Sequence, residues 1–335
     1  MPEILDKDNI RDQIQAFPQQ IIKGLKVEFD FEPLKVPADS NYVICGMGGS
    51  SQIYDLLQNI LESVGESVHI YVSRSYTLPR ETNDKSAVVV ISYSGNTEET
   101  LSCYDEAKEK GMPLVAMASG GSLKEKADAD GTPFVAIPTE GISQPRYSVG
   151  YQLAFHLKLL EAHGLIQNHD EEFVAACEEA ASFNYEDNGK ELAARLDGKI
   201  PVLYAASEYN AVIRMGTIKF GENSKILSHW NELPEMNHNE MNGFVYAPNQ
   251  GQFYVLMLRA ADNHERVTKR FEVLASLIKD KGIEVEEFDM EGSSRLARII
   301  SGLNYIDWAS FYVAQQNGVD PSPVDMVEDF KKKLG

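Results

Sequence analysis

The sequence predicts an α/β fold in which parallel strands form a sheet that helices cover on both faces. Two observations favour this class. Short, almost continuously apolar runs rich in β-branched residues recur along the chain, as expected of strands that are buried on both faces. Amphipathic helical segments lie between these runs, and this alternation is typical of parallel sheets. The 335 residues correspond to two domains, or to one large α/β unit.

Five apolar runs in the first half of the chain predict buried strands. They lie at residues 41–46, 68–73, 87–92, 113–118 and 133–138. Residues 51–64 and 97–111, between these strands, have the periodicity of amphipathic helices. The second helix ends in a basic turn followed by Gly111, and both features are typical of a helix C-terminus.

The second half of the chain resumes the alternation after a helical stretch at residues 148–197. Its predicted strands lie at residues 200–207, 251–258 and 283–288. A long helix that stops at Gly318, a proline-containing turn and a short helix follow. The aromatic side chains of the long helix fall on one stripe, which we interpret as a packing surface.

The two halves resemble each other, which indicates two α/β subdomains. Residues 87–122 and 253–294 pass through the same succession of strand, polar loop, helix, Lys-Gly stop and strand. We expect the chain to consist of an N-terminal subdomain at 1–160, a helical connection at 161–197 and a C-terminal subdomain at 198–335.

The charge of the chain disfavours several kinds of partner. Lys and Arg total 31 and Asp and Glu total 51, so the formal net charge is −20. Such a chain repels nucleic acid and anionic membrane surfaces unless a basic patch intervenes, and the one basic run is at residues 331–333. A small anionic substrate remains compatible with this charge, because one or two cationic groups suffice to bind it.

The sequence also disfavours membrane, disulfide and metal sites. No segment approaches the ~18–20 consecutive apolar residues that would span a bilayer. The first residues are acidic and polar, unlike a signal peptide, so we expect a cytoplasmic protein. Its three cysteines are far apart and have no metal-binding spacing, so we expect reduced thiols and no metal.

Two loops rich in glycine and hydroxyl side chains each follow a predicted strand and precede a predicted helix. In a parallel sheet both loops lie at the carboxyl edge, where ligands bind. Glycines let the backbone approach a ligand, hydroxyls donate hydrogen bonds, and helix N-termini supply free N–H groups. The loops therefore predict a site for a phosphate monoester. The candidate binding residues are Gly48, Gly49, Ser50, Ser92, Ser94 and Thr97.

Each loop also has a purely structural explanation. Residues 92–99 fit a capping box in which Thr97 caps the helix and Glu98 or Glu99 lies in its first turn. The first loop departs from Gly-x-Gly-x-x-Gly, and no Gly-x-x-x-x-Gly-Lys occurs, so a nucleotide is weakly supported and we expect no cofactor. Because both loops occupy equivalent positions, phosphate binding is the favoured interpretation.

Several segments resemble a known family. SYSGNTEET and GMGGS, each after a strand, resemble the sugar isomerase (SIS) domain, a phosphosugar-binding α/β unit. ENSKILSHWNELPEMNHNE, with RSYTLP, QPRYSVGY and GVDPSPVD, resembles the bifunctional phosphoglucose/phosphomannose isomerase family from about residue 41 onwards. The resemblance implies two SIS subdomains and a homodimer with active sites at the subunit interface. It also implies metal-independent interconversion of glucose 6-phosphate, mannose 6-phosphate and fructose 6-phosphate through a cis-enediol(ate).

The resemblance also implies roles for individual residues. By motif position, Glu222 matches the catalytic base, His238 the ring-opening histidine, and Arg146 the arginine beside the developing enediolate. Lys331 is the best match for a C-terminal lysine, although its two lysine neighbours leave the register open. Ser322, in the substrate-shaping turn, replaces the threonine that family members commonly have there, and we expect the shared hydroxyl to make this difference tolerable.

Alternatives remain open when these residues are considered individually. Arg146 would ordinarily be a surface arginine, and His229 competes with His238, although its position after an apolar run favours a structural role. The protein could also be an SIS isomerase for another sugar phosphate, or a non-catalytic phosphosugar sensor. A sensor would need neither Glu222 nor His238, so the presence of both favours an enzyme.

Overall fold

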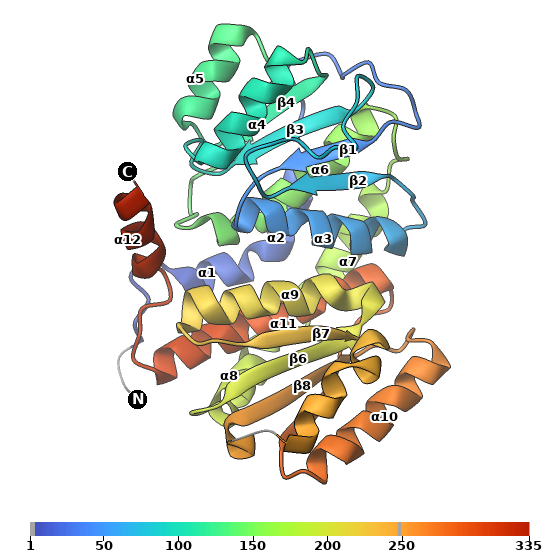
Figure 1. Ribbon diagram of the computed structural model, residues 1–335, viewed down its shortest axis with the longest axis vertical. Helices are drawn as coiled ribbons and strands as arrows, with labels where there is room; N and C mark the ends of the chain where they lie inside the picture. The colour runs from blue at the N-terminus through green and yellow to red at the C-terminus, as the bar shows by residue number, and fades with distance from the viewer. Residues whose placement is uncertain (1–3, 247–248, 335) are drawn as a thin grey trace. The chain divides into compact units, whose positions relative to one another are not determined.

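The computed structural model of the protein describes residues 4–246 and 249–334 (Figure 1). The chain divides into two compact units, each built on its own sheet. The first sheet unit is Ala16–Glu178, and the second sheet unit is Met1–Gln15 together with Glu179–Gly335. The beginning of the chain thus groups with the second sheet unit and not with the remainder of the 1–160 segment.

The first sheet unit contains a parallel sheet in the order β2-β1-β3-β4-β5. All residues of its three central strands β1, β3 and β4 are buried, as their continuous apolar sequences predict. The five strands are β1 (Tyr42–Cys45), β2 (Ile70–Ser73), β3 (Ala87–Ser92), β4 (Leu114–Ala118) and β5 (Phe134–Ala136).

Helices cover both faces of this sheet (Figure 1). Helices α4 and α5 pack on β3, β4 and β5, while α3 packs on β1 and β2. Helix α6 packs against α3, and α2 packs against α6. The helical elements are α2 (Phe17–Gly24), α3 (Gly49–Ser63), α4 (Glu98–Glu109), α5 (Gly121–Asp130), the 3-10 turn η1 (Pro145–Tyr147), α6 (Val149–Ala162) and α7 (Asp170–Ala181).

The second sheet unit contains a parallel sheet in the order β7-β6-β8-β9. Helices α8, α9 and α11 pack together, α1 packs on α11, and α10 packs on β8 and β9. The strands are β6 (Ile200–Ala206), β7 (His229–Leu233), β8 (Phe253–Arg259) and β9 (Glu284–Asp289). The helices are α1 (Ile10–Gln15), α8 (Tyr185–Arg195), α9 (Asn210–Lys219), α10 (Glu265–Lys279), α11 (Arg295–Gln316) and α12 (Asp325–Leu334). The short turns are η2 (Ser207–Tyr209), η3 (Phe220–Ser224), η4 (Glu235–His238), η5 (Glu240–Tyr246) and η6 (Gln250–Gln252).

The predicted α/β class, with two parallel sheets flanked by helices, is confirmed. Every predicted strand is present, with ends that differ by up to two residues. Strand β7 was not predicted. Its sequence, HWNEL, is polar and only Leu233 is buried, because β7 is an edge strand that pairs with β6 alone.

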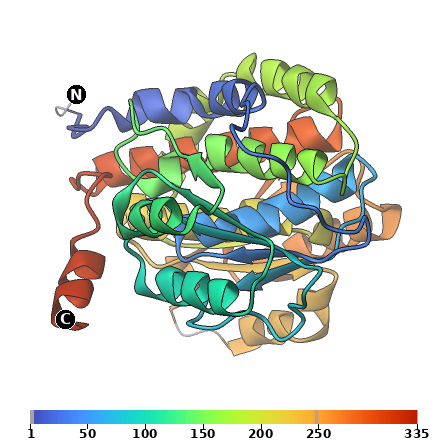
Figure 2. The same cartoon turned by 90° about the horizontal axis from the view of Figure 1, so that it is seen from above.

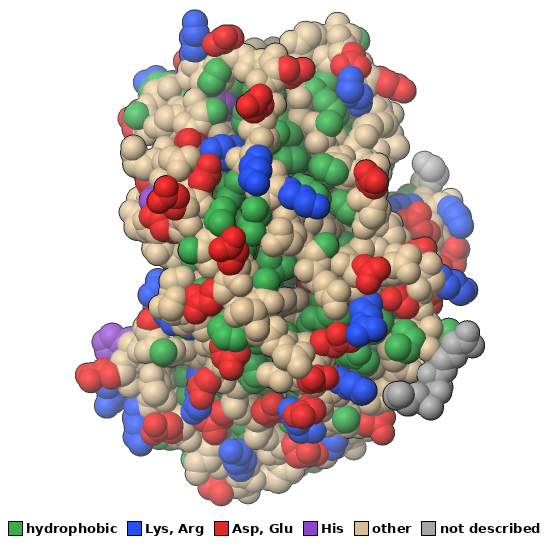
Figure 3. Space-filling model, turned by 180° about the vertical axis from the view of Figure 1, so that it is seen from behind, with side chains coloured by type: hydrophobic (Ala, Val, Ile, Leu, Met, Phe, Trp, Pro, Cys, Tyr) green, Lys and Arg blue, Asp and Glu red, His purple; other side chains and the backbone are tan. Residues whose placement is uncertain are grey.

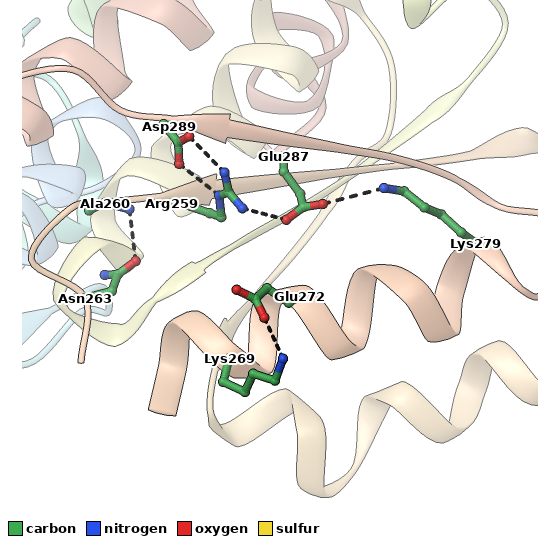
Figure 4. A network of polar contacts seen from close by, with 8 residues as sticks. All are labelled: Arg259, Ala260, Asn263, Lys269, Glu272, Lys279, Glu287 and Asp289. Atoms are coloured by element: carbon green, nitrogen blue, oxygen red, sulfur yellow. Dashed lines mark hydrogen bonds and ion pairs between the residues drawn. The ribbon is translucent and has the colours of Figure 1, made fainter. Parts of the chain in front are cut away.

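The opposite edge strand of the second sheet unit, β9, is acidic and paired with cations (Figure 4). Arg259 donates through Nε to Oδ1 of Asp289 at 2.9 Å and through Nη1 to Oε2 of Glu287 at 2.8 Å. The Nζ of Lys279 lies 3.5 Å from Oε1 of Glu287. Charged side chains on an edge strand oppose pairing with another sheet edge.

Helix α12 stands apart from the other helices of the second sheet unit in both views (Figures 1 and 2). None of its described residues is buried. Its apolar side chains Met326, Phe330 and Leu334 are exposed, at 88%, 62% and 63% of their surface. The helix therefore presents an uncovered apolar stripe beside its lysines.

Candidate active site

The first predicted phosphate loop lies between the carboxyl end of β1 and the start of α3. Gly48 precedes the helix with φ +51, a conformation that glycine adopts readily. A Cβ added to Gly48 would meet no atom within 4 Å, so this stretch of backbone is open to an approaching group. Ser50 lies in the first turn of α3 and is buried. The open backbone and the helix N-terminus together suit an anion.

The second predicted loop, between β3 and α4, is held by its own hydroxyl groups. The Oγ of Ser92 and the Oγ1 of Thr97 are 2.9 Å apart, and the N–H of Gly95 donates to Ser92 Oγ at 3.1 Å. Although Thr97 precedes α4, its side chain makes no capping hydrogen bond, so the capping-box alternative is wrong for this residue. Ser94 is exposed at the tip of the loop. The loop thus gathers hydroxyls at a helix N-terminus without using them as caps.

A third loop, which the sequence did not single out as part of the site, supports the second. The β3–β4 register pairs Ser92 with Ala118, so Ser119 follows β4 next to the Ser92 loop. The Ser119 hydroxyl donates to the carbonyl of Tyr93 at 2.6 Å, and the N–H of Ser122 donates to Oδ1 of Asn96 at 3.0 Å. The signal in the sequence was the Ser-Gly-Gly-Ser run at residues 119–122, directly after a predicted strand.

Two glycines allow these loops to touch. A Cβ on Gly95 would lie 1.8 Å from the carbonyl oxygen of Gly120, and a Cβ on Gly121 would lie 2.3 Å from the carbonyl oxygen of Ser94. Both glycines also have positive φ, at 72° and 70°. Any side chain at either position would force the loops apart.

Arg146 lies beside the first phosphate loop and is not a surface arginine. It is 2% exposed and belongs to the 3-10 turn η1. A Cβ added to Gly49 would lie 3.4 Å from the backbone nitrogen of Arg146, which places the two backbones in direct contact. The guanidinium carbon lies 5.1 Å from the centre of the Tyr147 ring. The first sheet unit therefore holds a buried cation next to its candidate phosphate cradle.

Glu222 lies in an unusual local structure in the second sheet unit. Helix α9 runs into a π-helical turn, η3, that contains Glu222 and ends at Lys225 with φ +60. The turn is fixed to α11, because Asn223 donates to Ser310 Oγ at 2.9 Å and Ser224 donates to the Ser310 carbonyl at 2.6 Å. Single π-turns are frequent at functional sites. The arrangement presents a half-buried carboxylate on a rigidly held turn.

The proline-containing turn that holds Ser322 lies against the Glu222 turn. The Nζ of Lys225 donates to the Glu222 carbonyl at 2.5 Å and to the Pro323 carbonyl at 2.7 Å. Ser322 is 1% exposed, and its hydroxyl donates to the carboxylate of Asp8. The turn is therefore held both by Lys225 and by the N-terminal segment of the same unit.

His238 and Lys331, also in the second sheet unit, differ from Glu222 in being exposed. His238 is the last residue of η4, two positions after the fully buried Met236. Lys331 lies on α12, where its Nζ is 2.8 Å from Oε1 of Glu328. The competing histidine, His229, is on β7 with its Nε2 3.0 Å from Oε2 of Glu240, a structural contact.

Charged side chains of both signs are distributed over the surface of the molecule that Figure 3 shows. On the face in Figure 3, acidic side chains are mixed with Lys and Arg and do not form a single field. Within residues 4–246 and 249–334, no three His, Cys, Asp or Glu side chains are grouped as metal ligands. No helix in the described part of the chain is long and apolar enough to cross a membrane.

Comparisons with known proteins show the family of the chain. Residues 185–334 match the bacterial phospho-glucose isomerase C-terminal SIS domain. A bifunctional phosphoglucose/phosphomannose isomerase of Aquifex aeolicus is 32% identical over 94% of this chain and 97% of its own length. The enzyme of the same name from Caldicellulosiruptor bescii is 33% identical, over 96% and 98%. The chain belongs to this family.

A solved structure extends the likeness in fold beyond the bifunctional isomerase family. The tagatose-6-phosphate ketose/aldose isomerase of Escherichia coli matches with a TM-score of 0.68 and 12% identity, over 93% of this chain and 94% of that one. At this identity the likeness concerns the fold alone. The two-sheet architecture of this chain is therefore shared with that solved structure.

Proposed function

We propose that the protein interconverts fructose 6-phosphate with glucose 6-phosphate and mannose 6-phosphate, without a metal. The observation that carries this proposal is the buried Arg146 beside the Gly48–Ser50 cradle, in a chain about one-third identical to bifunctional isomerases. Neutral hydroxyls and backbone N–H groups would bind the phosphate, so the net charge of −20 does not oppose it.

The first chemical step is the opening of the sugar ring. It requires a group that donates a proton to the ring oxygen as the proton of the anomeric hydroxyl is removed. An imidazole serves either role near neutral pH, and we assign the proton transfer at the ring oxygen to His238. Lys331 is the candidate for a second positive group near the reacting oxygens, with Lys332 and Lys333 as the alternatives to test.

The second step moves a proton between C1 and C2. Glu222 would remove the proton from C2 of the aldose, forming a cis-enediol(ate), and return it to C1, while the hydroxyl proton passes from O2 to O1 to give the ketose. Arg146 would stabilise the negative oxygen of that intermediate. Rotation about C2–C3 presents either face of C2 to the same carboxylate, which explains how both epimers share one site. Ser322 is proposed to shape the space for the two epimers through its turn.

Assays of the purified protein test the proposal. Fructose 6-phosphate is supplied, and glucose 6-phosphate and mannose 6-phosphate are followed by separate coupled reactions, with and without a metal chelator. We expect both products and no effect of the chelator. The absence of both products from folded protein would contradict the proposal, and binding of fructose 6-phosphate without turnover would favour the phosphosugar sensor.

We further propose that two copies associate in the cytoplasm. Exposed apolar side chains near the Glu222 and His238 turns support this, including Leu227 at 87%, Val245 at 62% and Tyr246 at 88% exposure. If the active site spans the subunits, mixing inactive Glu222→Gln and His238→Ala protomers restores part of the activity. Inactive mixed dimers, verified by mass, would contradict a shared site.

A further inference from the structure

The carboxylate of Glu240, two residues after His238, is held by three side chains. Tyr204 on β6 donates its hydroxyl to Oε1 at 2.5 Å. The Nδ2 of Asn231 on β7 donates to Oε2 at 2.5 Å, and the Nε2 of His229 on β7 lies 3.0 Å from the same oxygen. One carboxylate therefore fastens the segment after His238 to two strands of the sheet.

The segment before His238 is fastened as well. Met236 is 0% exposed and belongs to the apolar core formed by the sheet and α10. The Oδ1 of Asn237 accepts a hydrogen bond from Nη1 of Arg270 on α10 at 3.2 Å. His238 itself is exposed between these two attachments. The chain is thus attached to the sheet or to α10 on both sides of His238.

The charges of the cluster favour this arrangement. Burial disfavours ionisation of Glu240, but hydrogen bonds from His229, Tyr204 and Asn231 outweigh it and hold the pKa of the carboxyl below its ordinary value. The hydrogen bond to Glu240 in turn raises the pKa of His229. Because Glu240 stays ionised near neutral pH, all three contacts persist under the conditions of catalysis.

We propose that Glu240 is a positioning residue that holds the His238 imidazole for ring opening, with His229, Tyr204 and Asn231 as its supports. The inference rests on the proposed isomerase function. Glu240 acts through the backbone that it fixes and contacts no substrate. A displacement of a catalytic group by about 1 Å can lower a rate by ~10²-fold. Loosening the segment around His238 is therefore expected to slow ring opening.

The test separates ring opening from isomerisation. Exchange NMR follows the interconversion of the two anomers of glucose 6-phosphate, a reaction that needs His238 and not Glu222. Glu240→Ala and Glu240→Gln are measured in the Glu222→Gln background, where isomerisation does not contribute to the exchange. The matched control is Glu286→Gln, because Glu286 on β9 also accepts from a tyrosine, Tyr254 at 2.5 Å, and from a cation, Arg195 at 2.8 Å.

We expect Glu240→Ala to slow the catalysed exchange ~10²-fold, Glu240→Gln to slow it less, and Glu286→Gln to leave it unchanged. The KM of the otherwise wild-type Glu240 variants should change little while kcat falls. If Glu240→Ala does not fold, the exchange rate of Glu240→Gln alone decides the matter.

Two results would overturn the inference in distinguishable ways. If the wild-type protein isomerises fructose 6-phosphate and folded Glu240 variants retain the exchange rate of their parent, the inference is wrong and the proposed function stands. If the wild-type protein converts no sugar phosphate and does not accelerate the exchange, both are wrong.

Discussion

The Nζ of Lys219 lies 2.7 Å from Oδ1 of Asp307, and only 6% and 10% of these side chains are exposed. Lys219 is the last residue of α9, directly before the π-turn that contains Glu222, and Asp307 lies within α11. The ion pair therefore fixes the point at which the helix changes its winding. Breaking an ion pair at this depth is costly, because burial removes the hydration of the remaining charge.

Asp307→Ala should lower the free energy of unfolding by about 3–5 kcal/mol, because it removes one member of a buried ion pair. Urea unfolding at neutral pH measures the change. The matched control is Glu81→Ala, which breaks the solvent-exposed Arg80–Glu81 pair and should change the free energy of unfolding far less. Equal costs for the two variants would contradict the structural role of the Lys219–Asp307 pair.

Gly121→Ala should damage the phosphate site more than its backbone strain alone explains. Gly121 and Gly111 both have positive φ, but an added Cβ meets the Ser94 carbonyl at 2.3 Å in the first case and nothing within 4 Å in the second. We expect each substitution to cost about 1–2 kcal/mol of stability from the left-handed backbone. Gly121→Ala should in addition raise the KM for fructose 6-phosphate about tenfold, whereas Gly111→Ala should not. Equal KM values for Gly121→Ala and Gly111→Ala would show that the loop after β4 does not support the phosphate site.

The His229–Glu240 contact predicts a pH-dependent contribution to stability. Because the folded-state pKa of His229 is raised, its contribution is fully present below the unfolded value of about 6.5 and is lost as the pH rises through the folded value. His229→Gln should therefore destabilise the protein more at about pH 5.5, below the unfolded value, than at an alkaline pH above the folded value, where the wild-type ring has also lost its charge.

Urea unfolding of wild type and variant at both pH values measures this difference. The control is His264→Gln. It also removes a histidine ring, but the hydrogen-bond partner of that ring is the backbone N–H of Arg266, whereas the partner of His229 is a carboxylate. A destabilisation by His229→Gln that is the same at both pH values would refute the charged contact.

Lys225→Met should lower kcat about tenfold with little change in KM, because Lys225 links the Glu222 turn to the Pro323 turn. Steady-state kinetics with fructose 6-phosphate measure both constants. Lys281→Met, at an exposed lysine after α10, is the control for loss of a positive charge. An unchanged kcat in Lys225→Met would show that the link does not hold the carboxylate.

The sequence was informative where local physics decides the structure. Strands β1, β3 and β4 are continuous apolar runs, which only a sheet covered by helices on both faces can bury. The loops that follow these strands contain glycine and hydroxyl side chains, which indicated the phosphate site. Strand β7 was not predicted, because an edge strand needs neither continuous nor alternating apolar residues. Its side chains instead serve the contacts of Glu240.

The remaining features depend on partners distant in sequence. Arginine is rarely buried, so no pattern around residue 146 predicts its 2% exposure. The π-turn at Glu222 depends on hydrogen bonds from Asn223 and Ser224 to Ser310, almost 90 positions later. The contact of Asp8 with Ser322 places the N-terminal segment in the second sheet unit, which no repeat or motif signals.

The kcat of Glu222→Gln for conversion of fructose 6-phosphate into both aldose phosphates tests the central claim most directly. Glu191→Gln, at a carboxylate whose side chain is 73% exposed on α8, is the control. We expect Glu222→Gln to lower kcat by ~10²–10⁴-fold for both products while the control retains wild-type activity. A folded Glu222→Gln variant with the kcat of the wild type would contradict the account.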